Sequence, residues 1–195
     1  MSEISFEDRT VIVTGAGNGL GKAYAIELGN RGAKVVVNDL GGAVDGSGSG
    51  STPADEVVNE IIANGGEAVA NYDSVATKDG GEAIVQTAID SFGTVDAVIN
   101  NAGILRDKSF ATMTEEELSL IIDVHLKGTF FVSQPAFRVM KEKNYGRIVN
   151  VASPSGLFGN FGQSNYGAAK MGIVGLTNVL ACLLYTSPSP RDPNR

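Results

Sequence analysis

The chain has 195 residues, a hydrophobic fraction of 43% and a formal net charge of −7 at pH 7, which fits one water-soluble domain with a real core. A single Cys and a single His exclude a disulfide framework and a zinc cluster, so we expect a cytoplasmic protein without a metal site. The acidic balance argues against a nucleic-acid partner, and we find neither a secretory signal nor an apolar run near the roughly 18 residues of a membrane helix.

Short apolar runs alternate with helical patterns from the amino terminus onward. Runs rich in Val and Ile predict strands, and apolar residues three and four apart predict the helices between them. Such alternation indicates a doubly wound, parallel, Rossmann-type α/β sheet that is covered on both faces. The predicted strands are 11–14, 34–38, 67–71, 95–100 and 147–152, and the predicted helices are 20–31, 55–63, 82–92, 115–144 and 166 to about 180.

A Gly/Ser-rich stretch, GGAVDGSGSGS, covers residues 41–51. It has no periodicity and is typical of a surface loop. A linker between two domains is the alternative, but apolar patterning resumes directly on both sides, which favours the loop.

A glycine-rich turn, TGAGNGLG, follows the first strand at residues 14–21 and leads into a helix. Glycines allow the backbone to turn sharply and approach a pyrophosphate at the helix N-terminus. Asp39, at the end of the second strand, can accept hydrogen bonds from both ribose hydroxyls and would repel a 2′-phosphate. Since Asn18 also replaces a possible basic partner for that phosphate, NAD is favoured over NADP. A tight turn followed by a helix-capping Asp is the alternative.

The TGxxxGxG spacing of this turn resembles that of the short-chain dehydrogenase/reductase family. The residues Asn100-Asn101-Ala102-Gly103 resemble the family's NNAG motif, and Asp73-Ser74 resembles the pair beside the adenine ring, although Asp73 could instead cap a strand end. The cofactor-binding residues that this resemblance and the turn together imply are Gly15, Asn18, Gly19, Leu20, Gly21, Asp39, Asp73, Ser74, Asn100, Ala102, Gly103, Tyr166 and Lys170.

Ser153, Tyr166 and Lys170 are the predicted catalytic residues. Tyr166 and Lys170 are four residues apart in a predicted helix and therefore share one face. An isolated phenol has a pKa of about 10 and is a poor base near neutrality, but a nearby ammonium favours the phenolate. Ser153, just beyond the fifth strand, would hydrogen-bond the substrate oxygen. Together with TGxxxGxG and NNAG, the three residues match the Ser-Tyr-Lys triad of the family.

His125 stands where the family commonly has a fourth catalytic residue, an Asn. A lone His is more often structural, but this position would also suit the support of a proton-relay water. His125 is therefore kept outside the predicted catalytic residues.

Further segments narrow the resemblance to one subgroup of the family, in which His at position 125 is usual. These segments are NDLGG at 38–42, ANYDSV at 70–75, NAGILRD at 101–107 and GNFGQ at 159–163. They are similar to the (3R)-hydroxyacyl-CoA dehydrogenase domains of peroxisomal multifunctional enzymes of type 2 and to their bacterial single-domain relatives. The resemblance implies NAD-dependent oxidation of (3R)-3-hydroxyacyl-CoA thioesters. It also implies a homodimeric or homotetrameric intact protein, and a peroxisomal location if the parent is a eukaryotic multifunctional enzyme.

Two other functions stay open. One is a 3-oxoacyl reductase or a hydroxysteroid dehydrogenase, which runs the same chemistry on another small-molecule alcohol or ketone. The other is a nucleotide-binding scaffold without turnover, against which the intact Ser153, Tyr166 and Lys170 argue.

The last residues, 182–195, break the pattern and resemble a translated sequencing adapter. We therefore expect an NAD-binding domain at 1–181 that lacks the family's last two strands and the loop covering the substrate. The fifth strand would then be an exposed apolar edge. The chain as written is expected to be poorly soluble and nearly inactive.

Overall fold

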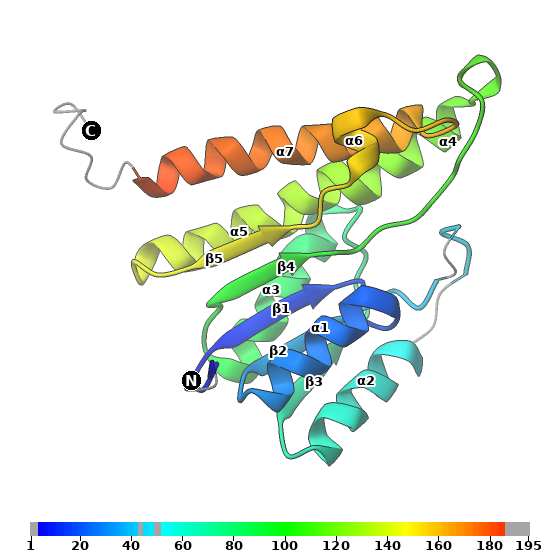
Figure 1. Cartoon of the computed structure of the whole chain (residues 1–195). Helices are drawn as coiled ribbons and strands as arrows, with labels where there is room; N and C mark the ends of the chain where they lie inside the picture. The colour runs from blue at the N-terminus through cyan, green and yellow to red at the C-terminus, as the bar shows by residue number, and fades with distance from the viewer. Residues whose placement is uncertain (1–3, 43–44, 49–51, 186–195) are drawn as a thin grey trace, which may run out of the picture.

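The computed structural model describes residues 4–42, 45–48 and 52–185 and contains one five-stranded parallel sheet in the order β3-β2-β1-β4-β5 (Figure 1). This topology confirms the predicted Rossmann-type fold. The strands are β1 (Thr10–Thr14), β2 (Lys34–Asn38), β3 (Glu67–Asn71), β4 (Ala97–Asn100) and β5 (Arg147–Asn150).

Helices connect the strands, and two more helices follow β5. The expected helix over 115–144 is interrupted, because six of its residues form a π-helical turn, η2. Two short helices, η1 and α6, had no counterpart among the predicted elements. The helices are α1 (Gly19–Asn30), α2 (Thr52–Ala63), α3 (Lys78–Phe92), η1 (Phe110–Thr112), α4 (Glu115–Ile121), η2 (Ile122–Lys127), α5 (Gly128–Glu142), α6 (Pro154–Phe158) and α7 (Ser164–Tyr185).

Two hydrophobic layers hold the helices against the sheet. Because successive strand residues point to opposite faces, Val11 and Val13 of β1 pack with α1 and α2, whereas Ile12 packs with α3 and α5. All three side chains are buried. The near-continuous Val and Ile runs of the central strands therefore follow from burial on both faces.

The parallel register brings the carboxyl ends of the strands to one edge. Asn38 of β2 lies beside Thr14 of β1 and Asn71 of β3, and Asn100 of β4 lies beside Asn150 of β5. Since β2 and β3 are neighbouring strands of one sheet, the connection that contains the Gly/Ser-rich stretch and α2 does not join two separate sheets. Of that stretch, residues 43–44 and 49–51 lie outside the described residues.

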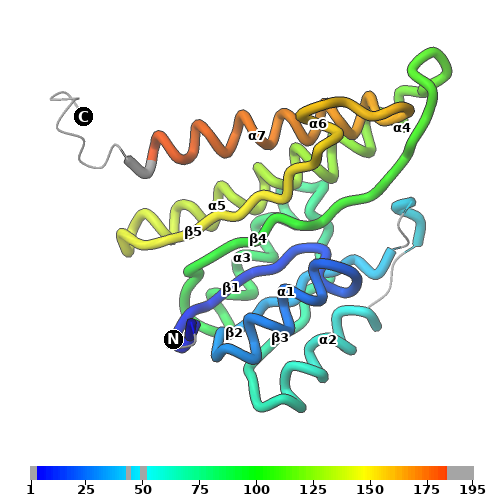
Figure 2. Tube along the Cα trace, in the orientation of Figure 1, coloured from blue at the N-terminus to red at the C-terminus, as the bar shows by residue number. Residues whose placement is uncertain are grey.

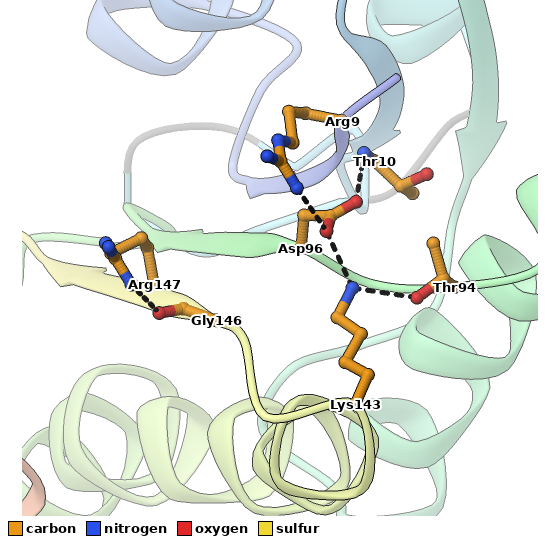
Figure 3. A network of polar contacts seen from close by, with 7 residues as sticks. All are labelled: Arg9, Thr10, Thr94, Asp96, Lys143, Gly146 and Arg147. Atoms are coloured by element: carbon orange, nitrogen blue, oxygen red, sulfur yellow. Dashed lines mark hydrogen bonds and ion pairs between the residues drawn. The ribbon is translucent and has the colours of Figure 1, made fainter. Parts of the chain in front are cut away.

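Asp96 forms a network of hydrogen bonds at the amino-terminal ends of the strands (Figure 3). Its carboxylate accepts hydrogen bonds from Lys143 Nζ at 2.7 Å, the Thr10 amide at 2.9 Å and Arg9 at 3.4 Å. Burial opposes ionisation of Asp96, but the bonds from Lys143 and Thr10 outweigh it and hold its pKa below the ordinary value. This network ties the start of β1 to the end of α5, on the side away from the cavity described below.

Helix α7 corrects an expectation about membrane segments. Residues Ser164–Leu183 of this helix are long and apolar enough, by length and composition alone, to cross a membrane, and 22% of the apolar window is buried. Asn and Thr residues interrupt this stretch, so it does not form one unbroken apolar run in the sequence. One such helix is weak support for a membrane segment, since core helices of water-soluble proteins meet the same criterion.

The last part of the described chain differs in length from the expected elements. Helix α7 continues to Tyr185 and so enters the segment 182–195 that was expected to lie outside the domain. Strand β5 is the edge of the described sheet, as expected, and its Val149 side chain is 51% exposed. In Figure 2 the segments that follow β4 and β5 run toward the same end of the molecule, where the Lys108 amide donates to the Gly162 carbonyl at 2.8 Å.

Candidate active site

A cavity of about 480 Å³ opens at the carboxyl edge of the sheet, a common place for ligands in doubly wound folds. It is lined by nine of the predicted cofactor-binding residues. The predicted residues Gly21, Asn100, Tyr166 and Lys170 do not line it. The nine are Gly15, Asn18, Gly19, Leu20, Asp39, Asp73, Ser74, Ala102 and Gly103.

The glycine turn forms the floor of this cavity because side chains would not fit there. Gly15 has a φ of +62°, and a Cβ on it would lie 2.7 Å from the Ala102 Cα. A Cβ on Gly17 would lie 2.8 Å from the carboxyl carbon of Asp39. Gly21 lies beneath the turn, against the Gly15 carbonyl, and so supports the floor without lining it.

Asp39 is held by two backbone amides. Its Oδ2 accepts from the Gly17 amide at 2.8 Å and its Oδ1 accepts from the Gly41 amide at 2.7 Å. Each carboxylate oxygen can accept a second hydrogen bond. The side chain is thus fixed beside the turn and can still bind donors from a ligand.

Two consecutive asparagines at the end of β4 have different roles. Asn101 donates to the carbonyls of Thr14 and Gly15, both at 3.0 Å, and thereby clamps the glycine turn. Asn100 is buried and donates instead to Ser133 and Asn150, at 2.9 and 2.8 Å. Asn100 therefore braces the sheet, whereas Asn101, which was not among the predicted cofactor-binding residues, lines the cavity.

Two further asparagines shape the end of the cavity near Asp73. The Asn38 amide donates to Asn71 Oδ1 at 2.8 Å and to the Asp73 carbonyl at 2.9 Å. Asn71 in turn donates to the Asp73 carboxylate at 2.8 Å. Both asparagines were overlooked, although polar residues at the last position of buried strands are a usable signal for a site.

Tyr166 and Lys170 lie together beyond the Gly103 end of the cavity. Lys170 Nζ is 5.6 Å from the centre of the Tyr166 ring, so the phenol and the amine are on one side of the molecule. The Lys170 side chain is 3% exposed and donates to the Val151 carbonyl at 2.6 Å. Burial lowers the pKa of Lys170 to about 8, so the ammonium is mostly protonated at neutral pH.

Ser153 comes to the same region from β5. It precedes α6, and its Oγ accepts from the Ser155 amide at 3.2 Å. The hydroxyl hydrogen of Ser153 therefore remains available for another acceptor.

Asn165 fixes the first turn of α7 and was not among the predicted residues. It is 1% exposed, and its amide donates to the carbonyls of Arg106 and Glu117, both at 3.1 Å. Its Oδ1 accepts from the Tyr166 amide at 2.8 Å. Every polar atom of this buried side chain is thus in a hydrogen bond. These bonds fix the position of Tyr166 relative to the loop after β4 and to α4.

His125 connects the cavity to Tyr166. The ring is buried in η2, its Nε2 lies 2.8 Å from the Ile104 carbonyl oxygen, and its edge meets the Tyr166 ring at a centroid distance of 5.0 Å. Its Nδ1 is buried without a hydrogen-bond partner among the described residues. Burial first, and then the nearby Lys170 ammonium, lower the pKa of His125 to about 4 despite the opposing bond with Ile104. The ring is therefore neutral at physiological pH.

The free energy of unfolding should report this buried ring. An unfolded His binds a proton below pH 6.5, but folded His125 does so only near pH 4, so acidification across this window favours the unfolded state. The shift amounts to about 3 kcal/mol of lost stability. Urea titrations at pH 6.5 and pH 4 measure the free energy of unfolding of wild type and of His125→Asn. As the pH falls, the free energy of wild type relative to the variant should decrease by that amount. A difference that does not change with pH would refute the neutral buried ring.

Comparison with known proteins places this geometry among related chains. A family profile described as "short chain dehydrogenase" matches residues 9–187. The peroxisomal hydratase-dehydrogenase-epimerase of Saccharomyces cerevisiae is 61% identical over 178 residues, which are 91% of this chain and 20% of that protein. The putative short-chain type dehydrogenase/reductase Rv0148 of Mycobacterium tuberculosis is 58% identical over 175 residues, covering 90% of this chain and 61% of that protein.

A solved structure agrees with these relatives. The full-length peroxisomal multifunctional enzyme type 2 from Drosophila melanogaster matches with a TM-score of 0.78 and 44% identity, over 94% of this chain and 29% of that one. The chain thus spans less than two thirds of the length of each of these proteins.

Proposed function

The chain belongs to the short-chain dehydrogenase family, and from this premise we propose that the intact protein oxidises (3R)-3-hydroxyacyl-CoA thioesters with NAD as the hydride acceptor. The observation that carries the proposal is the buried Lys170 ammonium, which lies 5.6 Å from the centre of the Tyr166 ring, beside the cavity whose floor is the glycine turn. The thioester substrate is supported by the similarity to proteins whose names include peroxisomal hydratase-dehydrogenase-epimerase and multifunctional enzyme type 2.

The family uses a nicotinamide cofactor, and the residues present fit one. A backbone floor that excludes side chains at Gly15 and Gly17 leaves room for a pyrophosphate at the start of α1. We assign the ribose to Asp39, the adenine end to Asp73 and Ser74, and the nicotinamide end to Ala102 and Gly103, next to Tyr166 and Lys170. When bound, the nicotinamide would take up the hydride that leaves the alcohol carbon.

The protein's own residues would handle the proton. Tyr166, as the phenolate, takes the hydroxyl proton of the alcohol while the C–H bond breaks and the carbonyl forms. Lys170 stabilises the phenolate, because its ammonium is held beside the ring in a poorly solvated place. Ser153 donates its free hydroxyl hydrogen to the substrate oxygen and stabilises the charge that develops there.

Asp39 supports NAD over NADP, because a fixed carboxylate would lie against a 2′-phosphate. The isosteric change Asp39→Asn removes the charge, so the ratio of the NADPH and NADH dissociation constants should fall by about 10-fold or more. Fluorescence titration of both reduced cofactors measures the ratio. Asp90→Asn, an exposed change on α3, is the control and should leave it unaltered. An unchanged ratio in Asp39→Asn would exclude the ribose assignment.

The substrate proposal is tested with a panel of substrates, by following NADH formation from alcohols and NADPH consumption by a ketone. The protein is expressed from its complete reading frame and is offered (3R)- and (3S)-3-hydroxyacyl-CoA thioesters and a hydroxysteroid with NAD, and a 3-oxoacyl thioester with NADPH. We expect the highest kcat/KM for the (3R) thioester with NAD. A preference for the 3-oxoacyl thioester or the steroid would replace the substrate, and cofactor binding without turnover of any of them would indicate a scaffold.

Size-exclusion chromatography with light scattering on the same preparation tests the proposed homodimer or homotetramer. A monomer at assay concentration would exclude it.

A further inference from the structure

Three segments meet at the Gln163 side chain, and one of them lies 56 residues earlier in the sequence. Its Oε1 accepts from the Ser155 hydroxyl at 2.7 Å and from the Asn160 amide at 3.0 Å. Its Nε2 donates to the Asp107 carboxylate at 2.9 Å. The amide thus links α6, the loop before α7 and the loop after β4. No part of the mechanism above uses this contact.

Gln163 is connected to Ser153 through one intervening residue, and it bonds to the helical turn that contains Tyr166. Ser155, which it holds, donates its amide to Ser153 Oγ at 3.2 Å. The Gln163 carbonyl accepts from the Gly167 amide at 2.7 Å, in the helical turn that contains Tyr166. Gln163 therefore bonds both to a neighbour of Ser153 and to a neighbour of Tyr166.

The backbones of α6 and α7 lie in close contact. A Cβ on Gly156 would lie 2.9 Å from the Met171 amide nitrogen, and one on Gly167 would lie 3.0 Å from the Ser155 carbonyl oxygen. The hydrogen bond from Ser155 to Gln163 adds a polar tie between α6 and the residue that precedes α7.

We propose that Gln163 is a positioning residue, which sets the distance between the Ser153 hydroxyl and the Tyr166 phenol by holding Ser155 on α7. The proposal rests on the proposed function, because it concerns the geometry of that reaction. A misplacement of about 1 Å at a reacting group can cost on the order of 100-fold in rate. Removal of Gln163 should therefore lower kcat and leave cofactor binding intact.

Variants at Gln163 and Asp107 separate positioning from a general loss of structure. Gln163→Ala removes all three bonds. Gln163→Glu keeps an acceptor for Ser155 but sets a carboxylate against Asp107. Both should reduce kcat about 10- to 100-fold, with the NADH dissociation constant within about twofold of wild type. In the exchange Gln163→Glu/Asp107→Asn, the new amide at position 107 can donate to the new carboxylate, and most of kcat should return.

Asn160→Ala is the matched control, since it removes one bond to the same oxygen and leaves Ser155 in place. It should keep nearly all of the wild-type kcat. The proposal is overturned if Gln163→Ala retains wild-type kcat, if the exchange variant stays as slow as Gln163→Glu, or if the loss in kcat comes with an equal loss of NADH binding. A wild-type protein without turnover would instead refute the proposed function, and with it this role of Gln163.

Discussion

Tyr166→Phe is expected to reduce kcat by about 1,000-fold or more and to leave the NADH dissociation constant unchanged. The variant lacks only the hydroxyl that would take the substrate proton, and positioned acid–base groups contribute about 100- to 10,000-fold. The Phe ring keeps the edge contact with His125, so the packing of α7 on η2 is retained. Steady-state assays with the (3R) thioester measure the loss.

Tyr145→Phe is the control for Tyr166→Phe. Tyr145 stacks under the Arg9 guanidinium, 4.2 Å from the ring centre, at the edge of the sheet away from the cavity. This variant should keep the wild-type kcat. A Tyr166→Phe enzyme that is as fast as Tyr145→Phe would remove the phenol from the mechanism.

Lys170→Met is expected to lose activity to a similar extent and yet to unfold no more easily at neutral pH. Methionine fills the space of the side chain without the charge that stabilises the phenolate. Folding lowers the pKa of Lys170 from 10.5 to about 8 through burial, so below pH 8 the charged side chain opposes folding by about 3 kcal/mol. Loss of the bond to the Val151 carbonyl costs about 1 to 3 kcal/mol in the other direction.

The pH dependence of unfolding distinguishes this account from simple damage. Between pH 8 and 10.5 the unfolded chain holds a proton that folded Lys170 has lost, so wild-type stability should gain a contribution as the pH rises through this range. Urea titrations should show this gain in wild type and in the exposed-site control Lys141→Met, but not in Lys170→Met. If Lys170→Met gained the same contribution as wild type, the buried ammonium would not be its source.

The sheet and its glycine turn were predictable because they depend on local patterns. Burial of β1 on both faces requires apolar residues at the consecutive positions Val11, Ile12 and Val13, and the turn at Gly15 requires a residue without a side chain. Tyr166 and Lys170 share a helix face by spacing alone, and the structure brings them together as that spacing implies.

Other features depend on contacts that spacing does not encode. Asn100 and Asn101 are adjacent, but only the exact end of β4 decides that one braces the sheet and the other clamps the turn. The Gln163 amide binds Asp107, 56 positions earlier, through the folding of two loops.

Helix ends and interruptions were also beyond the sequence patterns. The π-helical turn η2 places the buried His125 against Ile104 and Tyr166, an arrangement set by tertiary packing. Helix α7 was expected to end near residue 180, but it continues to Tyr185.

The most direct test of the account is a single-turnover experiment on protein saturated with NAD. The enzyme is mixed with the (3R) thioester, and NADH absorbance is followed in wild type and Tyr166→Phe side by side. The account predicts a rapid rise to about one NADH per site in wild type, and no rise over the same time in the variant, which binds NAD equally well. An equal rise in both proteins, or none in a wild type that is fully loaded with NAD, would contradict it.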